Sequence, residues 1–464
     1  MSALSSLILG VMALLRPLLL DNVPSIQQSA ALALGRLANY SDELAEAVVS
    51  NEILPQLVYS LSEQNVSKKV ASMPDSPIDF QIIEPLSIVT ICLTAFLLPC
   101  PQRFYKKAAA YVLRSVAKHS PHLAKAVVHS GALDALVNCL EEFDPSVKEA
   151  AALALSCVAK HNADLAQSVV DAGAVGLLVL CVQEPELTLK RISATALSEI
   201  AKHTEELAQA VVDQGAVPYL AALISHPDAQ LKRYVCQCLA QIAKHTVDLA
   251  EVVVEAEIFP RIFNCLKDID VQVRKNAATC IREIAKQTTE LAKLIVHSGG
   301  AAATVDYISE SKGNARLPGI MTLGYISAFD DSLAMAVIVS KGIAPLKDAL
   351  IHEPEDHIKA AAAWSLGQIG RHSPDHAKYL AEADVPARLL AVYMMQEGQG
   401  STDLKDKSKK ALKNIIQMCT HLSSLEPLLI LAPNNILTYV TAQFAKVLPQ
   451  NTEAKKTFIK SGGF

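Results

Sequence analysis

The sequence predicts an all-α solenoid of about ten three-helix repeats, and three observations predict it. One phrase recurs with a period of 42 residues. The chain is 51% hydrophobic, mainly Ala, Leu, Val and Ile, while only 5% of it is aromatic and it holds a single Trp. Small aliphatic side chains fill the seams between packed helices. Each period also divides into segments with helical spacing of apolar residues.

The recurring phrase reads LAKAVVHSGAL in one copy and LAQAVVDQGAV in another. Its leading leucines stand 42 residues apart at Leu123, Leu165, Leu207, Leu249, Leu291 and Leu333. A degenerate copy begins at His376. Each unit is apolar on more than one face, so it needs neighbours to bury its surface. We therefore expect residues 1–464 to form a single solenoid.

The apolar spacing within one unit predicts three helices, over residues 120–130, 132–140 and 146–161. Gly131 ends the first of them. Asp144 is an expected N-cap, and Pro145 follows it in the first helical turn, where its missing N–H costs nothing. An acid recurs before the third helix at Glu186, Asp228, Asp270 and Glu355.

The repeat register also predicts irregular regions. Residues 1–40 match a truncated first repeat, residues 421–464 match an incomplete last repeat, and both ends resemble cuts in a longer array. Between Leu44 and Leu123 the spacing is 79 residues, and removing residues 66–102 restores the period. This non-repeat insertion is a functional loop, a regulated splice form or a retained intron.

The retained intron is the favoured interpretation of residues 66–102. The segment begins with Val66, whose codons start with GT, and ends with Gln102, which CAG encodes. The preceding LLPCP is written mostly in pyrimidines. These features are typical of splice donor, acceptor and polypyrimidine tract. Sequencing the transcript across Asn65 and Arg103 tests the interpretation.

Charge and motifs exclude several functions. The formal net charge is −5 and the pI is near 6.2, which disfavours nucleic acid as a partner. The apolar run Leu86 to Cys100 is too short to span a bilayer, and Ser2 to Leu20 lacks a basic n-region. No phosphate-binding, zinc-protease or nucleophile-elbow motif occurs. We expect no enzyme, cofactor, metal, membrane or small-molecule substrate.

A ladder of histidines stands at the end of successive third helices: His119, His161, His203 and His245, continued by Gln287, Phe329 and His372. A zinc site needs ligands within about 2.1 Å of the metal, whereas laddered positions lie a helix spacing apart. Gln and Phe replacements also fit no metal. We expect a structural role, in which these residues interact with the helix dipole and the next repeat.

The repeat resembles the armadillo family, because VKEAAALALSCVAKH and GALDALV match its third and second helices. The resemblance implies a right-handed armadillo-type α-solenoid. The phrases EPEDHIKAAAAWSLGQIGRHSP and RFYKKAAAYVLRSVAKHSP most resemble armadillo proteins of the axonemal central pair. That resemblance implies a non-catalytic scaffold in cytoplasm and cytoskeleton, at the axoneme of cilia and flagella. The implied partners are central-apparatus components and microtubules. The alternative is a general adaptor in transport or signalling.

Two sets of residues are candidate partner-binding positions. A basic ladder near the start of successive third helices opposes the helix dipole: Lys106, Lys148, Lys190, Lys232, Arg274, Arg316 and Lys359. These basic residues bind an acidic partner such as a tubulin tail, or else they pair with the acids at Asp144, Glu186, Asp228, Asp270 and Glu355. On the third-helix face, Tyr111, Tyr325 and Trp364 are candidate anchors or packing residues. Trp364 with Gln368 approaches the Trp–Asn ladder of import armadillo proteins, which the other repeats lack.

Overall fold

The computed structural model describes residues 10–59, 61–62, 101–395, 400–450 and 452–460. Every regular element in these ranges is a helix. The chain divides into two compact units, Met1–Leu220 and Ala221–Phe464. The predicted insertion at 66–102 lies outside the described residues, except for Pro101 and Gln102, with which the first helix after it begins.

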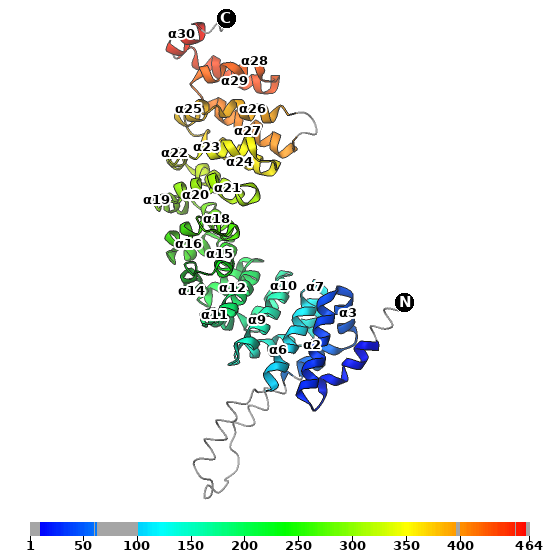
Figure 1. The fold of residues 1–464 in the computed structure, drawn as a ribbon. Coiled ribbons are helices and arrows are strands. Elements are labelled where there is room, and N and C mark those ends of the chain that lie inside the picture. The colour runs from blue at the N-terminus through cyan, green and yellow to red at the C-terminus, as the bar shows by residue number, and fades with distance from the viewer. Residues whose placement is uncertain (1–9, 60, 63–100, 396–399, 451, 461–464) are drawn as a thin grey trace. The chain divides into compact units, whose positions relative to one another are not determined.

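Third helices pack on one another in sequence order within the N-terminal unit (Figure 1). α2 packs on α6, α6 on α9, and α9 on α12. The elements are η1 Pro17–Leu20, α2 Pro24–Tyr40, α3 Asp42–Ser50, α6 Pro101–Ala117, α7 Pro121–His129, α8 Ala132–Leu140, α9 Pro145–Ala159, α10 Ala163–Asp171, α11 Ala174–Gln183, α12 Leu187–Ala201, α13 Glu205–Asp213 and α14 Ala216–Leu223. The helices predicted over 120–130, 132–140 and 146–161 are α7, α8 and α9.

The C-terminal unit repeats this packing, from α15 on α18 through α21 and α24 to α27. Its elements are α15 Ala229–Ala243, α16 Val247–Glu255, α17 Phe259–Cys265, α18 Val271–Ala285, α19 Thr289–His297, α20 Gly300–Glu310, η2 Gly313–Ala315, α21 Leu317–Phe329, α22 Asp331–Val339, α23 Ile343–His352, α24 Asp356–Ile369, α25 Pro374–Glu382, α26 Val385–Tyr393, α27 Thr402–Met418, η3 Leu422–Ser424, α28 Glu426–Leu431, α29 Asn434–Val447 and α30 Thr452–Lys460.

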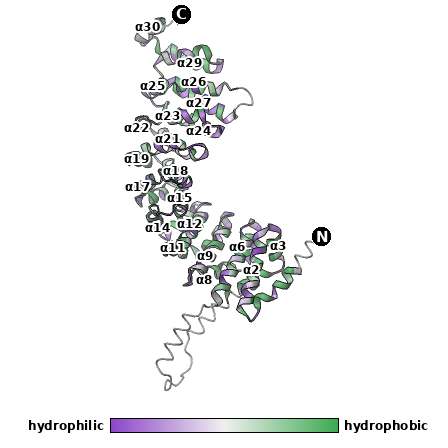
Figure 2. Ribbon diagram, in the orientation of Figure 1, coloured by the Kyte–Doolittle hydropathy of each residue, from purple (hydrophilic) through white to green (hydrophobic). Residues whose placement is uncertain are grey.

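The helix boundaries follow from local chemistry. Gly131 and Gly173 adopt positive φ of 74° and 80° between first and second helices, a conformation that glycine takes without steric cost. Asp144 caps α9 by accepting a hydrogen bond from the Ser146 amide at 2.8 Å, as predicted. Figure 2 shows hydrophobic and hydrophilic residues mixed within individual helices, as expected where each helix buries one face.

The histidine ladder joins each third helix to the preceding one. His161 Nε2 donates to the Ala117 carbonyl at 2.6 Å, and His203 Nε2 donates to Ala159 at 2.7 Å. Gln287 makes the same bond to Ala243 at 2.8 Å. These carbonyls lie in the last turn of a helix, where no intrahelical donor reaches them. The structural role is as expected, but the partner belongs to the preceding repeat and not the next.

Lysines beside the histidines extend this bonding. Lys160 Nζ donates to the Lys118 carbonyl at 2.6 Å, and Lys202 Nζ donates to the Lys160 carbonyl at 2.6 Å. The recurring AKH sequence therefore supplies two adjacent donors to the open end of the neighbouring third helix. This explains in physical terms why Lys and His recur together with the period of the fold.

Candidate functional site: partner-binding faces of the repeats

In the N-terminal unit, two members of the basic ladder form ion pairs within the fold. Lys106 is only 3% exposed, and its Nζ lies 2.7 Å from Glu142 Oε1. Lys148 Nζ lies 2.7 Å from Glu184 Oε1. In both pairs the carboxylate follows the lysine by 36 residues and lies just after the end of the second helix. Lys190, the next member of the ladder, is half-buried.

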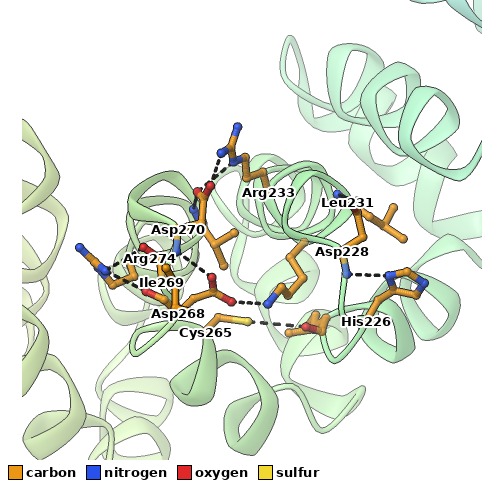
Figure 3. Close-up of polar contacts among 12 residues, drawn as sticks. His226, Asp228, Leu231, Arg233, Cys265, Asp268, Ile269, Asp270 and Arg274 are labelled. Atoms are coloured by element: carbon orange, nitrogen blue, oxygen red, sulfur yellow. Dashed lines mark hydrogen bonds and ion pairs between the residues drawn. The ribbon is translucent and has the colours of Figure 1, made fainter. Parts of the chain in front are cut away.

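The C-terminal unit uses its ladder residues in the same way. Lys232 forms an ion pair with Asp268, and Arg274 Nη1 donates to the Asp268 carbonyl at 2.8 Å. Figure 3 shows Asp268 and Asp270 gathered with Arg233 and Arg274 at this edge. Arg316 is 4% exposed and lies 2.8 Å from Asp348 and 3.2 Å from Glu353. Lys359 is half-buried.

The acids expected to pair with the ladder have another role. Asp228 accepts from the Leu231 amide at 2.7 Å, and Asp270 accepts from the Gln272 amide at 2.8 Å, so both cap helices as Asp144 does. Asp270 also binds Arg233, whose hydrogen bond lowers the Asp270 pKa to about 2. Asp270 is thus held at the helix terminus by a backbone amide and pairs with Arg233, which is not a member of the ladder. The alternative that these acids pair with the ladder stays a prediction. Glu186 and Glu355 precede their helices without a side-chain cap bond.

Tyr325, Trp364 and Gln368 lie together in the C-terminal unit. The Tyr325 and Trp364 rings meet edge to face, with centroids 5.1 Å apart and planes at 69°. A Cβ at Gly324 would overlap the Trp364 ring, so the glycine makes room for the indole. One turn along α24, the Gln368 side-chain oxygen is buried without a hydrogen-bond partner among the described residues.

Tyr111 lies in the N-terminal unit, in a groove of about 610 Å³ along α2, α6, α9 and α12. Arg36, Lys107 and Arg114 line the same groove, and Glu149 is the acid among its lining residues. Burial, more than the neighbouring acids, raises the Glu149 pKa. Lys107 and Arg114 were not predicted as site residues. Their spacing from Tyr111, four residues before and three after, is the signal that places them on one helix face.

Within the described residues, no group of three His, Cys, Asp or Glu side chains is placed to hold a metal ion. No single described helix is long and apolar enough to cross a membrane. The pairs α7 with α8 and α10 with α11 reach that length and composition only together, and they are bent by 83° and 80°.

Comparison with known proteins defines the class of this fold. The family model described as Armadillo/beta-catenin-like repeat matches residues 120–156 and 204–244. An engineered protein of known crystal structure matches 94% of this chain and 98% of its own, with a TM-score of 0.77 and 22% identity. The chain contains armadillo repeats, and its fold is all-α and armadillo-type.

The similarity to individual curated proteins covers a smaller part of the chain. The sequence is 59% identical over 118 residues to sperm-associated antigen 6 of Homo sapiens and 60% identical to that of Mus musculus. Each match covers 25% of this chain and 23% of the relative. The match to these curated relatives therefore spans about a quarter of their length.

Proposed function

We propose that this chain is a protein-binding scaffold of the axonemal central apparatus in cilia and flagella, where it binds central-apparatus components and microtubules. The observation that carries the proposal is the 59% identity over 118 residues to sperm-associated antigen 6, in a chain that contains armadillo repeats. Armadillo solenoids are a non-enzymatic scaffold type, and they act through their surfaces.

The groove of the N-terminal unit supports protein binding in physical terms. Tyr111 supplies an aromatic surface, and Arg36, Lys107 and Arg114 supply positive charge around it. Aromatic and Arg side chains carry much of the energy of protein interfaces. In contrast, most of the basic ladder already binds carboxylates inside the fold. We therefore propose Tyr111 with Arg114, in preference to the ladder, as partner-binding residues.

Localisation of the tagged full-length chain in a multiciliated cell tests this function. We expect signal along the axoneme, and we expect the double variant Tyr111→Ala with Arg114→Ala to lose it while remaining folded by circular dichroism. Phe143→Ser is the matched control, because Phe143 is 98% exposed in the same unit but does not line the groove. A chain that never reaches the axoneme contradicts the proposal.

A second candidate is a general adaptor in transport or signalling. It is favoured by the Trp364 ring and by the Gln368 oxygen one turn later, which has no hydrogen-bond partner among the described residues. This pair approaches the Trp–Asn pattern that binds basic peptides. Affinity for a basic import-signal peptide separates the two candidates. Tight binding that Trp364→Ala abolishes favours the adaptor, whereas weak binding that the variant leaves unchanged favours the axonemal scaffold.

A further inference from the structure

A second hollow lies on the first and second helices of the N-terminal unit, away from the groove that the third helices line. It occupies about 660 Å³ between α11 and the following α13 and α14. Leu180 and Tyr219 line it and are 57% and 45% exposed. Exposed apolar side chains that border one hollow indicate an interaction surface.

The hollow depends on residues that depart from the repeat. At the position of Leu180, the repeats one period before and two periods after carry Asn138 and Asn264. At the position of Gly176, the preceding repeat carries Asp134. A Cβ at Gly176 would lie 2.8 Å from the Gln214 side-chain oxygen. Because glycine has no Cβ, the Gln214 amide can lie at this position beside the hollow. Compared with the repeats that carry Asn138 and Asn264, this repeat therefore has an apolar side chain at the edge of the hollow. Compared with the repeat that carries Asp134, it has no side chain at Gly176.

The helices around the hollow and the turn after α11 carry acidic side chains and no basic ones. Residues 163–186 and 205–220, which hold α10, α11, α13 and the part of α14 that belongs to the N-terminal unit, contain no Lys, Arg or His. Their acids are Asp164, Asp171, Glu184, Glu186, Glu205, Glu206 and Asp213. Asp213 lines the hollow itself, and Glu184 is neutralised by Lys148. In the preceding repeat, the corresponding helices carry Lys125, which shows that cations are compatible with this face.

We propose that this surface binds a segment of a partner protein in which an apolar side chain is flanked by Lys or Arg. The apolar side chain enters the hollow between Leu180 and Tyr219, where its burial supplies most of the affinity. The flanking cations lie against Asp213 and the neighbouring acids, which speeds association and selects basic partners. The same field repels nucleic acid and anionic lipid, so a protein segment is the favoured ligand.

A peptide-binding experiment tests the inference on the full chain. The probe is a fluorescein-labelled peptide Lys-Lys-Leu-Phe-Lys-Lys, followed by fluorescence anisotropy. Matched peptides replace the lysines with Glu or the Leu-Phe pair with Ser-Ser. We expect the probe Lys-Lys-Leu-Phe-Lys-Lys, called the lysine–leucine peptide below, to bind. We expect both control peptides to bind at least tenfold more weakly. Binding should weaken as salt rises, because the flanking charges are exposed.

Variants locate the binding on the hollow. Leu180→Asn introduces the residue that two other repeats carry, and we expect it to weaken the peptide at least tenfold. Asp213→Asn should weaken it less and reduce the salt dependence. Phe143→Ser removes an even more exposed apolar side chain elsewhere in the same unit and should leave affinity unchanged.

Three outcomes overturn the inference: no binding of the lysine–leucine peptide, equal binding by Leu180→Asn, or tighter binding of phosphatidylserine vesicles than of the peptide. None of them bears on axonemal localisation, which is measured separately.

Discussion

α8 and α11 occupy the same place in successive repeats of the N-terminal unit, and an exposed position distinguishes them. Their inward positions are alike, since Leu136 and Leu178 are both fully buried. Their outward positions differ, with Asn138 exposed on α8 and Leu180 exposed on α11. The period of 42 residues is therefore maintained by packing and by bonds between repeats. The outer positions differ between these two repeats, and we propose that partner selection takes place there.

The largest expected effect lies among the bonds between repeats. Arg316→Met leaves Glu353, which is 5% exposed, without its cation. An uncompensated buried charge costs about 3–5 kcal/mol of unfolding free energy. Urea denaturation followed by circular dichroism measures the loss. Arg388→Met in the same unit is the control, because its pair with Asp384 is about half exposed and contributes roughly 0–1 kcal/mol. Equal losses in both variants contradict the distinction.

A smaller effect is expected at the histidine ladder. His161→Ala removes the donor to the Ala117 carbonyl and should cost about 1 kcal/mol of unfolding free energy. His161→Gln should cost clearly less, since Gln287 makes the corresponding bond in another repeat. Thermal melting of the two variants beside wild type checks this. If Gln is as damaging as Ala, the hydrogen bond is not what the ladder contributes.

Most of the fold was predictable because its signals are local and repeated. Gly131, Asp144 and the apolar spacing fix helix boundaries within one unit, and the period multiplies them. Pairing between repeats was less predictable. Two sets of acids lie near the basic ladder in sequence, and only the structure shows that Asp228 and Asp270 turn to backbone amides while Asp268 takes the lysine.

The candidate site was only partly predictable. Tyr325, Trp364 and Gln368 were named from their register; the Tyr325 and Trp364 rings are in contact, and the role of the three residues in binding stays a prediction. Lys107 and Arg114 were missed because a basic residue one turn from an aromatic one is common in any amphipathic helix. The hollow beside Leu180 was missed because the period directs attention to what repeats, whereas this surface arises where one repeat departs from the others.

The histidine ladder also predicts a modest pH dependence. Burial lowers the His161 pKa below its ordinary value, and the cations of Lys160 and Lys202 act in the same direction. The unfolded chain then takes up a proton at higher pH than the folded chain. The neutral ring's contribution to stability is present above pH of about 6.5 and is lost as pH falls below it. Melting temperature at pH 7.5 and 5.5 should fall less in His161→Gln than in wild type. An identical fall excludes His161 as the titrating group.

The smallest expected effect on stability is at the outer face itself. Leu180→Asn should change the unfolding free energy by no more than about 0.5 kcal/mol, because exposed substitutions away from caps and ion pairs rarely do more. Leu178→Ala, two residues earlier on α11 and fully buried, should cost about 2–5 kcal/mol. Urea denaturation of both variants measures the contrast. A large loss in Leu180→Asn means that this leucine packs within the unit, and the distinction between inward and outward positions of α11 then fails.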